Sequence, residues 1–349
     1  MISNTKQQKV AVGLSGGVDS SIAAYLLKEQ GYDVVGVHMQ CWDYNDAACT
    51  GEQDRADAVK IATQLNIPFL TLNFEKEYRE NVISYFYNEY RSGRTPNPDV
   101  VCNREIKFGL FYDWAMSQGF DFIATGHYAR VKHSPAQLFK GVDSSKDQSY
   151  FLYQVPLQKL EKVLFPLGEM YKEDVRKLAT NIGLPTANKA DSVGICFIGE
   201  VNIKDFLRAE IPFNFGPVTN ISGEVIGEHD GIAFYTIGQR HGFRVSKYHG
   251  LPLYVIGKDA STNTLVVGYS EQGKCTNFSV QSTVWHSNVV LPLECSVRIR
   301  HLGEVYSCTL SGTPSNVNVE LHKGIHGIAP GQSAVFYLDN LVMGGGIIH

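Results

Sequence analysis

Hydrophobic positions in the first half of the chain alternate between two patterns. Short β-branched apolar runs are typical of strands buried in a sheet, whereas longer segments with apolar residues three or four positions apart predict helices. The predicted strands are 9–14, 33–38, 69–73 and 120–125. The predicted helices are 18–30, 52–65 and 75–92. Strands that alternate with helices in this way predict a parallel sheet covered by helices.

The pattern changes after about residue 205. Pro and Gly become frequent, and short alternating strands separated by turns dominate, which predicts small all-β units or a barrel. These strands are 231–236, 253–257, 264–268, 295–300, 306–310, 316–320 and 333–337. We therefore predict an α/β domain over 1–208, followed by two smaller, mostly β domains over 209–274 and 275–349, of which the last is a β-barrel.

The chain has 349 residues, of which 44% are hydrophobic and 19% are charged, as is ordinary for a globular enzyme of two or three domains. No apolar run approaches the length that a bilayer requires, so we expect no membrane segment. Residues 1–8 lack the apolar core of a signal peptide, which favours a cytoplasmic location. The net charge of −4 weighs against nucleic acid as a partner, although a local basic patch is enough to hold phosphates.

Seven cysteines are spread along the chain at irregular spacings, with no CxxC pair and no Cys/His cluster. This distribution argues against a structural zinc site and against the disulfide framework of a secreted protein. We therefore expect no metal-ligating residues of that kind. The ordinary expectation for each cysteine is a buried free thiol.

The strongest local motif is SGGVDS at residues 15–20, which follows the first predicted strand and opens the first predicted helix. Two glycines let the backbone turn sharply, and the freed N–H groups together with the helix N-terminus form a site for anions. No Lys follows the glycines, so the loop is not a Walker A motif, and the pattern is not GxGxxG. An ordinary capped turn is the alternative. The motif resembles that of the PP-loop ATP pyrophosphatases, which implies ATP as the ligand.

Two further strand ends belong to the same edge of the predicted sheet, where α/β proteins bind their ligands. Met39 ends the second strand, and Gly126 and His127 follow the strand at 120–125. Gly126 would let a nucleotide approach closely, and His127 could face the substrate. The alternatives are an ordinary strand end for Met39 and a structural hydrogen-bonding role for His127.

The segment NPDVVCNREIKFG at 97–109 contains the first cysteine of interest. Two prolines at 96 and 98 predict a loop, so we expect a helix to begin around 102–105 and to run through Trp114. Cys102 would then lie at a helix N-terminus, where the dipole and the charges of Arg104 and Lys107 stabilise a thiolate. An inert thiol in a helix cap is the alternative.

The segment DSVGICFIG at 191–199 contains the second cysteine of interest, Cys196. Cys196 lies between Gly194 and Gly199, which predicts an accessible thiol on a mobile loop. Such a thiol suits persulfide chemistry, because the terminal sulfur must travel between donor and acceptor. A cysteine in a strand is the alternative. On this basis we assign the persulfide to Cys196, and to Cys102 the stabilised thiolate that attacks or resolves it.

Taken together, these segments resemble the tRNA-specific 2-thiouridylases over essentially the whole chain. The motifs that carry the resemblance are SGGVDS, NPDVVCNREIKFG, ATGHYAR, KDQSYFLYQV, LFPLGEMYKEDVR, DSVGICFIG, YTIGQRHG and PGQSAVFY. The resemblance implies a PP-loop domain similar to the adenine nucleotide alpha hydrolases. It also implies that ATP, with Mg²⁺, adenylates the 2-carbonyl of the wobble uridine of tRNA and releases AMP and pyrophosphate.

The same resemblance implies roles for individual residues. Cys196 would carry sulfur as a persulfide, Cys102 would assist the transfer, a disulfide between them would form during the cycle, and Asp99 would act as acid and base with a raised pKa. The residues implied to bind ATP are Gly13, Leu14, Ser15, Gly16, Gly17, Val18, Asp19, Ser20, Met39 and Gly126. Those implied to contact tRNA are Asn97, Pro98, Asp99, His127, Lys146, Asp147, Gln148, Arg300, His301 and Gln332.

The same motifs imply the binding partners and leave two alternative functions open. The partners would be tRNA and a persulfide-donating sulfur carrier or cysteine desulfurase, and we expect a monomer. One rival is another PP-loop adenylating enzyme that acts on tRNA, such as a ligase similar to lysidine synthetase, which needs no cysteine pair. The other is a non-catalytic sulfur carrier or RNA-binding scaffold, against which the intact SGGVDS loop argues.

Overall fold

The computed structural model describes residues 7–42, 51–191, 194–199, 202–246 and 250–349. The chain divides into two compact units. The first combines Met1–Val82, Pro98–Val201 and Asn340–Val342, and the second combines Ile83–Asn97, Asn202–Asp339 and Met343–His349.

The first unit is built on a parallel sheet of five strands in the order β3-β2-β1-β4-β7. Its strands are β1 Lys9–Gly13, β2 Asp33–Gln40, β3 Phe69–Asn73, β4 Phe122–Ala124 and β7 Val163–Leu164. A short antiparallel hairpin, β5 Ala129–Lys132 and β6 Gln137–Lys140, follows β4. The predicted parallel sheet is confirmed, and its central strand β1 is buried along almost its whole length, as is usual in parallel sheets.

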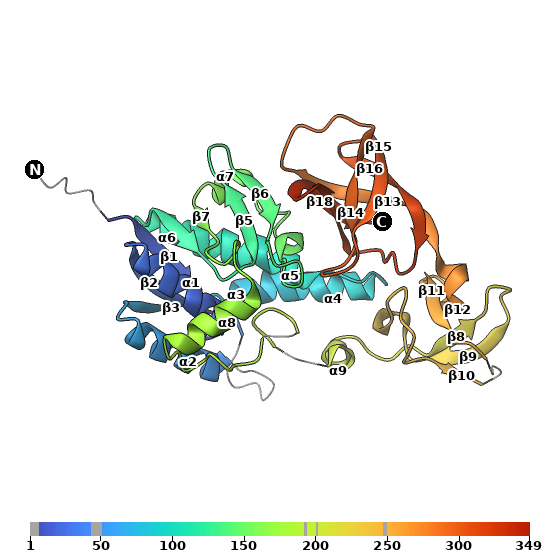
Figure 1. Ribbon diagram of the computed structural model, residues 1–349. Coiled ribbons are helices and arrows are strands. Elements are labelled where there is room, and N and C mark those ends of the chain that lie inside the picture. The colour runs from blue at the N-terminus through green and yellow to red at the C-terminus, as the bar shows by residue number, and fades with distance from the viewer. Residues whose placement is uncertain (1–6, 43–50, 192–193, 200–201, 247–249) are drawn as a thin grey trace, which may run out of the picture. The chain divides into compact units, whose positions relative to one another are not determined.

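Helices cover this sheet (Figure 1). They are α1 Val18–Glu29, α2 Gly51–Gln64, α3 Glu75–Tyr78, α7 Leu157–Leu160 and α8 Lys172–Asn181. Leu27 of α1 and Ile61 of α2 share one apolar core with Val10 and Val12 of β1. On its other side, α1 packs against α8. The interface of α1 with the sheet therefore fixes the loop that precedes it.

A continuous helical run carries Cys102, and it begins earlier than predicted. It consists of α5 Pro98–Cys102, the π-helix η2 Asn103–Leu110 and α6 Phe111–Ser117. The expected start around 102–105 is wrong, because Pro98 does not exclude a helix. The N–H that proline lacks would have no intrahelical partner in the first turn, so proline is favoured there. Another run consists of α3, the π-helix η1 Arg79–Ile83 and α4 Ser84–Arg91, and confirms the helix predicted over 75–92.

The second unit contains two β structures. The smaller is a five-stranded sheet in the order β10-β9-β8-β12-β11. Its strands are β8 Gly216–Thr219, β9 Val225–His229, β10 Arg244–Val245, β11 Tyr254–Asp259 and β12 Thr264–Gly268. A short helix, α9 Ile203–Arg208, precedes it. The described residues also contain the 3₁₀ turns η3 Ser149–Phe151, in the first unit, and η4 Ile232–Phe234 and η5 Ser270–Gly273, in the second.

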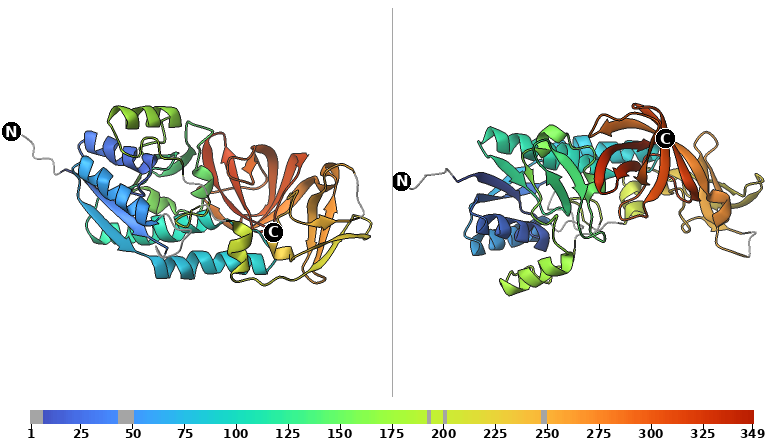
Figure 2. Two further views of the ribbon diagram at one scale, coloured as in Figure 1. Left: turned by 90° about the horizontal axis from the view of Figure 1, so that it is seen from below. Right: turned by 45° about the horizontal axis from the view of Figure 1, so that its top comes forward.

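The larger is a closed six-stranded barrel, in which β13 pairs with both β16 and β18 (Figure 2). The strands in barrel order are β13 Cys275–Trp285, β16 Asn316–Ile325, β15 Tyr306–Thr313, β14 Leu293–Arg298, β17 Ser333–Leu338 and β18 Leu341–Ile348. The predicted succession of a parallel-sheet domain, a small β part and a terminal barrel is confirmed.

The strand predicted over 231–236 is wrong. The structure has the 3₁₀ turn η4 there, and the Lys258 ammonium donates hydrogen bonds to the carbonyls of Ile232 at 3.2 Å and Tyr235 at 2.5 Å. A side-chain donor thus satisfies backbone groups that a strand would pair with a neighbour. Among the described residues, no helix is both long enough and apolar enough to cross a bilayer.

Candidate functional site

The SGGVDS loop connects β1 to α1, and its shape requires glycine. Gly16 has a φ of 77°, and a Cβ at this position would lie 2.2 Å from the carbonyl oxygen of Asp54. The hydroxyls of Ser15 and Ser20 lie 3.1 Å apart across the loop. Both the backbone conformation and the lack of space therefore exclude a side chain at position 16.

The predicted nucleotide-binding residues of separate strands meet around this loop. A Cβ at Gly126, after β4, would lie only 2.7 Å from the backbone of the first turn of α1. The Cε of Met39, near the end of β2, would lie 3.2 Å from a Cβ at Gly13. Leu14 and Val18 are buried in the core, so they shape the loop from beneath rather than line it.

Asp19, in the first turn of α1, is held by Lys172, the first residue of α8. Its carboxylate oxygens lie 2.8 and 2.7 Å from Lys172 Nζ, and the Tyr128 hydroxyl donates to Asp19 at 2.8 Å. Only 8% of Lys172 is exposed, so solvent screens this ion pair weakly. Burial and the charge of Asp19 raise the pKa of Tyr128, whose hydroxyl therefore stays protonated and donates.

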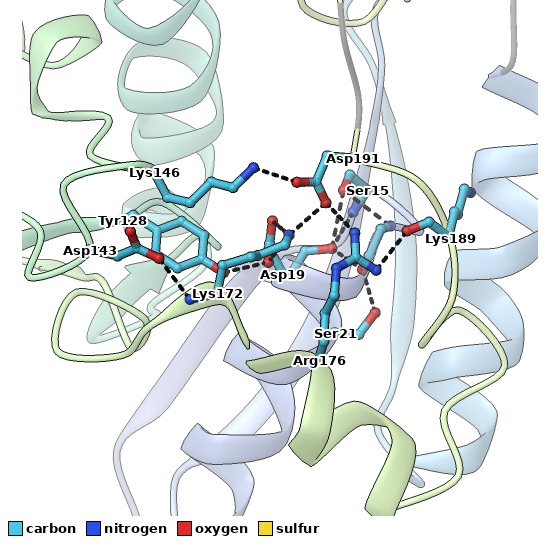
Figure 3. Close-up of polar contacts among 12 residues, drawn as sticks. Ser15, Asp19, Ser21, Tyr128, Asp143, Lys146, Lys172, Arg176, Lys189 and Asp191 are labelled. Carbon is cyan, nitrogen blue, oxygen red and sulfur yellow. Dashed lines mark hydrogen bonds and ion pairs between the residues drawn. The ribbon is translucent and has the colours of Figure 1, made fainter. Parts of the chain in front are cut away.

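Asp191 gathers three cations beside this pair (Figure 3). Its carboxylate lies 2.7 Å from Lys146, 2.8 Å from Lys172 and 2.6 Å from Arg176. Burial opposes ionisation, but hydrogen bonds from Lys146 and Lys172 lower the pKa of Asp191 to about 2. Lys146, which the sequence assigned to tRNA, therefore lies in the cluster of charges next to the SGGVDS loop.

Lys189 contacts the loop itself. Its ammonium donates to the carbonyl of Gly16 at 3.2 Å and to the carboxylates of Asp54 and Asp57 at 2.8 Å each. The cations around the loop are thus paired with carboxylates. A polyphosphate could take over such cations, because ammonium and guanidinium groups bind phosphate oxygens strongly.

Sequence reasoning missed four members of this cluster. They are Lys172, Arg176, Lys189 and Asp191. The signal that was present is the spacing of Lys172 and Arg176, four residues apart and hence on one face of a helix. The carboxylates that hold them come from distant segments, which no local pattern reveals.

The two predicted cysteines meet in the same unit. Cys102, the last residue of α5, is fully buried, whereas Cys196 is partly exposed. Both are free thiols, and their side chains are hydrogen-bonded to each other. The amide of Cys196 donates to the Asp99 carboxylate at 3.1 Å, which adds Asp99 to the cluster.

Cys196 lies in a tight turn. Ile195 and Gly199 are bridged to each other, and Phe197 has a φ of 67°, in the region that bulky residues avoid. The Tyr78 hydroxyl donates to the carbonyl of Cys196 at 2.5 Å, and the Tyr78 ring meets the ring of Phe197 edge-on at 5.9 Å. Contacts to Tyr78 thus hold a turn that glycines alone would leave loose.

The charges of the two thiols are the reverse of the sequence prediction. A hydrogen bond from Cys102 lowers the pKa of Cys196, and the charge of Lys107 lowers it further against the opposing effect of burial. Burial and the same hydrogen bond raise the pKa of Cys102 well above its ordinary value. The directions of these shifts favour a thiolate on Cys196 rather than on Cys102.

The predicted place of Cys102 at a helix N-terminus is wrong, and two features of its surroundings differ from the prediction. The helix begins at Pro98, so Cys102 lies inside it and gains no stabilisation from unpaired N–H groups at its start. Arg104 donates hydrogen bonds to Glu105 and Gln154, at 2.6 and 2.7 Å, and the cation that acts on the thiols is Lys107. Burial alone would lower the pKa of Lys107, but the charges of Cys196, Cys102 and Asp99 raise it, so Lys107 stays a cation.

Asp99 has the direction of pKa shift that the sequence predicted. Burial raises the pKa of its carboxyl group, while the Cys196 amide and the charge of Lys107 oppose the rise. A carboxyl group with a raised pKa can exchange a proton at a pH where an ordinary Asp stays ionised. Asp99 therefore lies next to the thiols with the property that an acid and base needs.

Other residues assigned to tRNA have partners inside the first unit. His127 is buried, its Nδ1 lies 2.7 Å from the Thr125 hydroxyl, and burial lowers its pKa well below the ordinary value, so it is neutral. Asp147 is buried and accepts from the amides of Gly141 and Ser149. Gln148 accepts from the backbone of Tyr128. These contacts indicate that the three residues stabilise the fold of the first unit.

The remaining ones belong to the second unit, apart from Pro98, which starts α5. The amide of Gln332 donates to the carbonyls of Thr95 and Pro96 at 3.0 Å each, immediately before Asn97, which is nearly buried. Arg300 donates to the carbonyls of Ile237 and Gly327. His301 follows Arg300 in the turn between β14 and β15 and is partly buried.

Comparisons with known proteins cover the whole chain. Three family models match it in order: a "tRNA methyl transferase HUP domain" over residues 8–200, a "tRNA methyl transferase PRC-barrel domain" over 204–269 and an "Aminomethyltransferase beta-barrel domain" over 275–348. The chain is 46% identical to the tRNA-specific 2-thiouridylase MnmA 1 of Geobacillus kaustophilus, over 98% of this chain and 96% of that protein. It is 45% identical to the proteins called tRNA-specific 2-thiouridylase MnmA in Listeria welshimeri and Streptococcus uberis, over 100% and 99% of this chain and 96% of each relative.

Proposed function

The chain belongs to the family of tRNA-specific 2-thiouridylases, and from this premise we propose that it is a sulfurtransferase that makes 2-thiouridine in tRNA. In the finer form of the proposal, ATP adenylates the 2-carbonyl oxygen of the wobble uridine, and sulfur from a cysteine persulfide then replaces that oxygen. The observation that carries the proposal is the pair of hydrogen-bonded thiols, Cys102 and Cys196, in the unit that also holds the SGGVDS loop.

The nucleotide half of the reaction uses the loop and its cations. The uridine oxygen attacks the α-phosphorus of ATP, pyrophosphate leaves, and the oxygen becomes part of an AMP leaving group. The loop amides and Lys172 bind the departing pyrophosphate, whose negative charge develops there. Asp19 suits Mg²⁺, because this ion is commonly held by one or two carboxylates together with substrate phosphates. The ion would neutralise phosphate charge.

The sulfur half begins at Cys196, because it is the thiol with the lowered pKa. Its thiolate attacks the outer sulfur of a donor persulfide, so that Cys196 gains the terminal sulfur and the donor leaves as a thiolate. The terminal sulfur then adds to C2 of the uridine and AMP departs. At this point the transferred sulfur is bonded both to C2 of the uridine and to Cys196 Sγ.

Cys102 completes the transfer. When Cys196 is bound to sulfur, it no longer carries the negative charge that raises the pKa of Cys102. Lys107 can then stabilise a Cys102 thiolate, and Asp99 can accept its proton. Attack on Cys196 Sγ breaks the S–S bond, releases the 2-thiouridine and leaves a disulfide between Cys102 and Cys196, which an external thiol reduces.

The alternative of a tRNA-modifying PP-loop ligase is disfavoured by this thiol cluster, since a ligase has no use for it. A non-catalytic carrier is disfavoured by the intact nucleotide loop. We further propose that a sulfur carrier or cysteine desulfurase supplies the persulfide, that the protein works as a cytoplasmic monomer, and that its three domains are 1–208, 209–274 and 275–349. Of the predicted tRNA contacts, Asn97, Pro98, Arg300, His301 and Gln332 keep this assignment, whereas the contacts above favour structural roles for His127, Asp147 and Gln148.

The test is a reconstituted reaction. Purified protein receives unmodified tRNA, ATP, Mg²⁺ and a cysteine desulfurase with cysteine, and the tRNA nucleosides are measured by mass spectrometry. We expect 2-thiouridine together with AMP and pyrophosphate. ADP as the product, or sulfur incorporation that does not depend on ATP, would contradict the assignment.

A further inference from the structure

A second pair of thiols lies in the barrel, and neither thiol takes part in the proposed reaction. Cys295 on β14 and Cys308 on β15 are directly opposite each other in the antiparallel register. Their Sγ atoms lie 3.7 Å apart, and both thiols are free. Cys308 is fully buried, whereas Cys295 is partly exposed. One member of the pair is thus accessible to a reagent, and the other is shielded behind it.

The two sulfur atoms are too far apart for a disulfide bond, and the two strands would have to move slightly closer to form one. Residues directly opposite in an antiparallel pair have Cβ atoms about 4.5–5.5 Å apart, whereas a disulfide needs about 3.5–4.5 Å between Cβ atoms and about 2.05 Å between sulfurs. Such a bond would draw the two strands together locally. Strained disulfides of this kind are more easily reduced than structural ones.

We propose that Cys295 and Cys308 form a reversible disulfide when the protein meets an oxidising small-molecule disulfide, and that this bond stiffens the hairpin of β14 and β15. The Cys295 thiolate attacks the small disulfide, forms a mixed disulfide and releases one thiolate. Cys308 then loses its proton and attacks Cys295 Sγ, which closes the internal bond and releases the second thiol. Two protein thiols are oxidised while one small disulfide is reduced to two thiols.

The place of the pair in the hairpin explains what the bond would change. The last registered pair before the turn is Val297 with Tyr306, two residues along each strand from the cysteines. The turn that follows carries Arg300, whose guanidinium donates to the carbonyls of Ile237 and Gly327. A covalent link just below the turn would restrain its opening, because both strands would have to separate together.

The test uses the full-length protein with Cys275→Ser, which removes the exposed thiol that shares a tryptic peptide with Cys295. Trypsin cuts after Arg298 and Arg300, so Cys295 lies in peptide 275–298 and Cys308 in peptide 301–323. After treatment with oxidised glutathione and alkylation of the remaining thiols, mass spectrometry should find the two peptides joined. Dithiothreitol should separate them.

Two variants and one further measurement decide the outcome. Cys295→Ser should abolish the joined peptides, and a Cys102→Ser, Cys196→Ser background should leave them unchanged. Hydrogen exchange of residues 299–305 should slow at least severalfold on oxidation of the Cys275→Ser protein and stay unchanged in the Cys295→Ser variant. A stable glutathione adduct on Cys295 without joined peptides would overturn the proposal, as would oxidation without slower exchange. Neither readout involves tRNA or ATP, so both are independent of the proposed function.

Discussion

In both thiol pairs of the described chain, a fully buried cysteine is hydrogen-bonded to a partly exposed one. Their surroundings differ in charge. Lys107 lowers the pKa of Cys196, whereas in the barrel the hydrogen bond, burial and the anion Glu294 all raise the pKa of Cys308. Proximity of two thiols therefore makes a disulfide feasible. A cation beside them favours the thiolate form of one thiol.

The largest expected effect separates the two pairs by function. Cys196→Ser and Cys102→Ser should each reduce 2-thiouridine formation by more than about a thousandfold, as for other enzymes that lose a nucleophile. Cys295→Ser should leave it within about twofold, since the barrel pair takes no part in the chemistry. Nucleosides quantified by mass spectrometry are the measurement, and full thiolation by either of the first two variants would end the two-thiol mechanism.

Loading with labelled sulfur sharpens the same distinction. With a cysteine desulfurase and labelled cysteine, the Cys102→Ser protein should hold label as a persulfide on Cys196, because its thiolate remains. The Cys196→Ser protein should hold at least about tenfold less, since the Cys102 thiol is fully buried and a donor persulfide cannot reach it. Label retained on Cys102 alone would reverse the roles.

Asp99→Asn should lower the rate of thiolation by about a hundredfold or more, the usual contribution of a general acid or base. Binding of tRNA should stay within about twofold, because the amide keeps the size of the carboxyl group. Asp113→Asn is the matched control, an exposed residue of α6 paired with Lys159. Turnover of Asp99→Asn equal to that of the control would leave Asp99 as an acceptor for the Cys196 amide only.

Lys107→Met removes the cation that distinguishes the two pairs. The charge of Lys107 helps to lower the pKa of Cys196 in the native protein, so loss of Lys107 should move that pKa upward. The pH at which Cys196 reacts half-maximally with iodoacetamide should rise accordingly, as followed by peptide mass spectrometry. Arg104→Gln should leave the profile in place, because Arg104 faces Glu105 and Gln154. Equal shifts in both variants would show that net charge, and not Lys107, sets the reactivity.

The smallest effect concerns the anion beside the barrel pair. Glu294→Gln should speed the formation of joined peptides by oxidised glutathione about two- to threefold, since the charge of Glu294 raises the pKa of Cys308. The effect is small because exposed charges act weakly through solvent. Glu271→Gln, an exposed residue paired with Lys274, is the control. A slower rate in Glu294→Gln would mean that its hydrogen bond to Thr309, rather than its charge, matters.

The sequence was sufficient for the parallel sheet, because periodicity is a local property of strands such as β3, whose predicted and observed limits agree. It was also sufficient for the loop, since the turn at Gly16 needs neighbouring glycines. The start of α5 was missed because a proline was taken as a breaker where it is favoured. Strand β18 was missed because of its glycines, yet a Cβ at Gly344 would lie 2.2 Å from the carbonyl oxygen of Val284, where the barrel closes.

The ionisation of the thiols could not be predicted, for a different reason. Which of Arg104 and Lys107 faces Cys102 depends on the helix that joins them, and the hydrogen bond to Cys196 comes from a segment 94 residues further along the chain. The pKa values of the two thiols therefore depend on contacts that form only in the folded protein. Local motifs identified the participants, Asp99, Cys102 and Cys196, but not the distribution of charge among them.

The π-helical segment directly after Cys102 determines where the positive charge of Lys107 lies relative to the two thiols. In an α-helix, residues five positions apart are separated by about 1.4 turns and point to different sides. In a π-helix, the hydrogen bonds run from i to i+5, so such residues lie nearly above one another. Widening the helix by one residue per turn therefore turns Lys107 to the side on which Cys102 lies. If the same residues formed a regular α-helix without the π-helical segment, Lys107 would point to a different side from Cys102, and both sulfurs would lose their counter-ion.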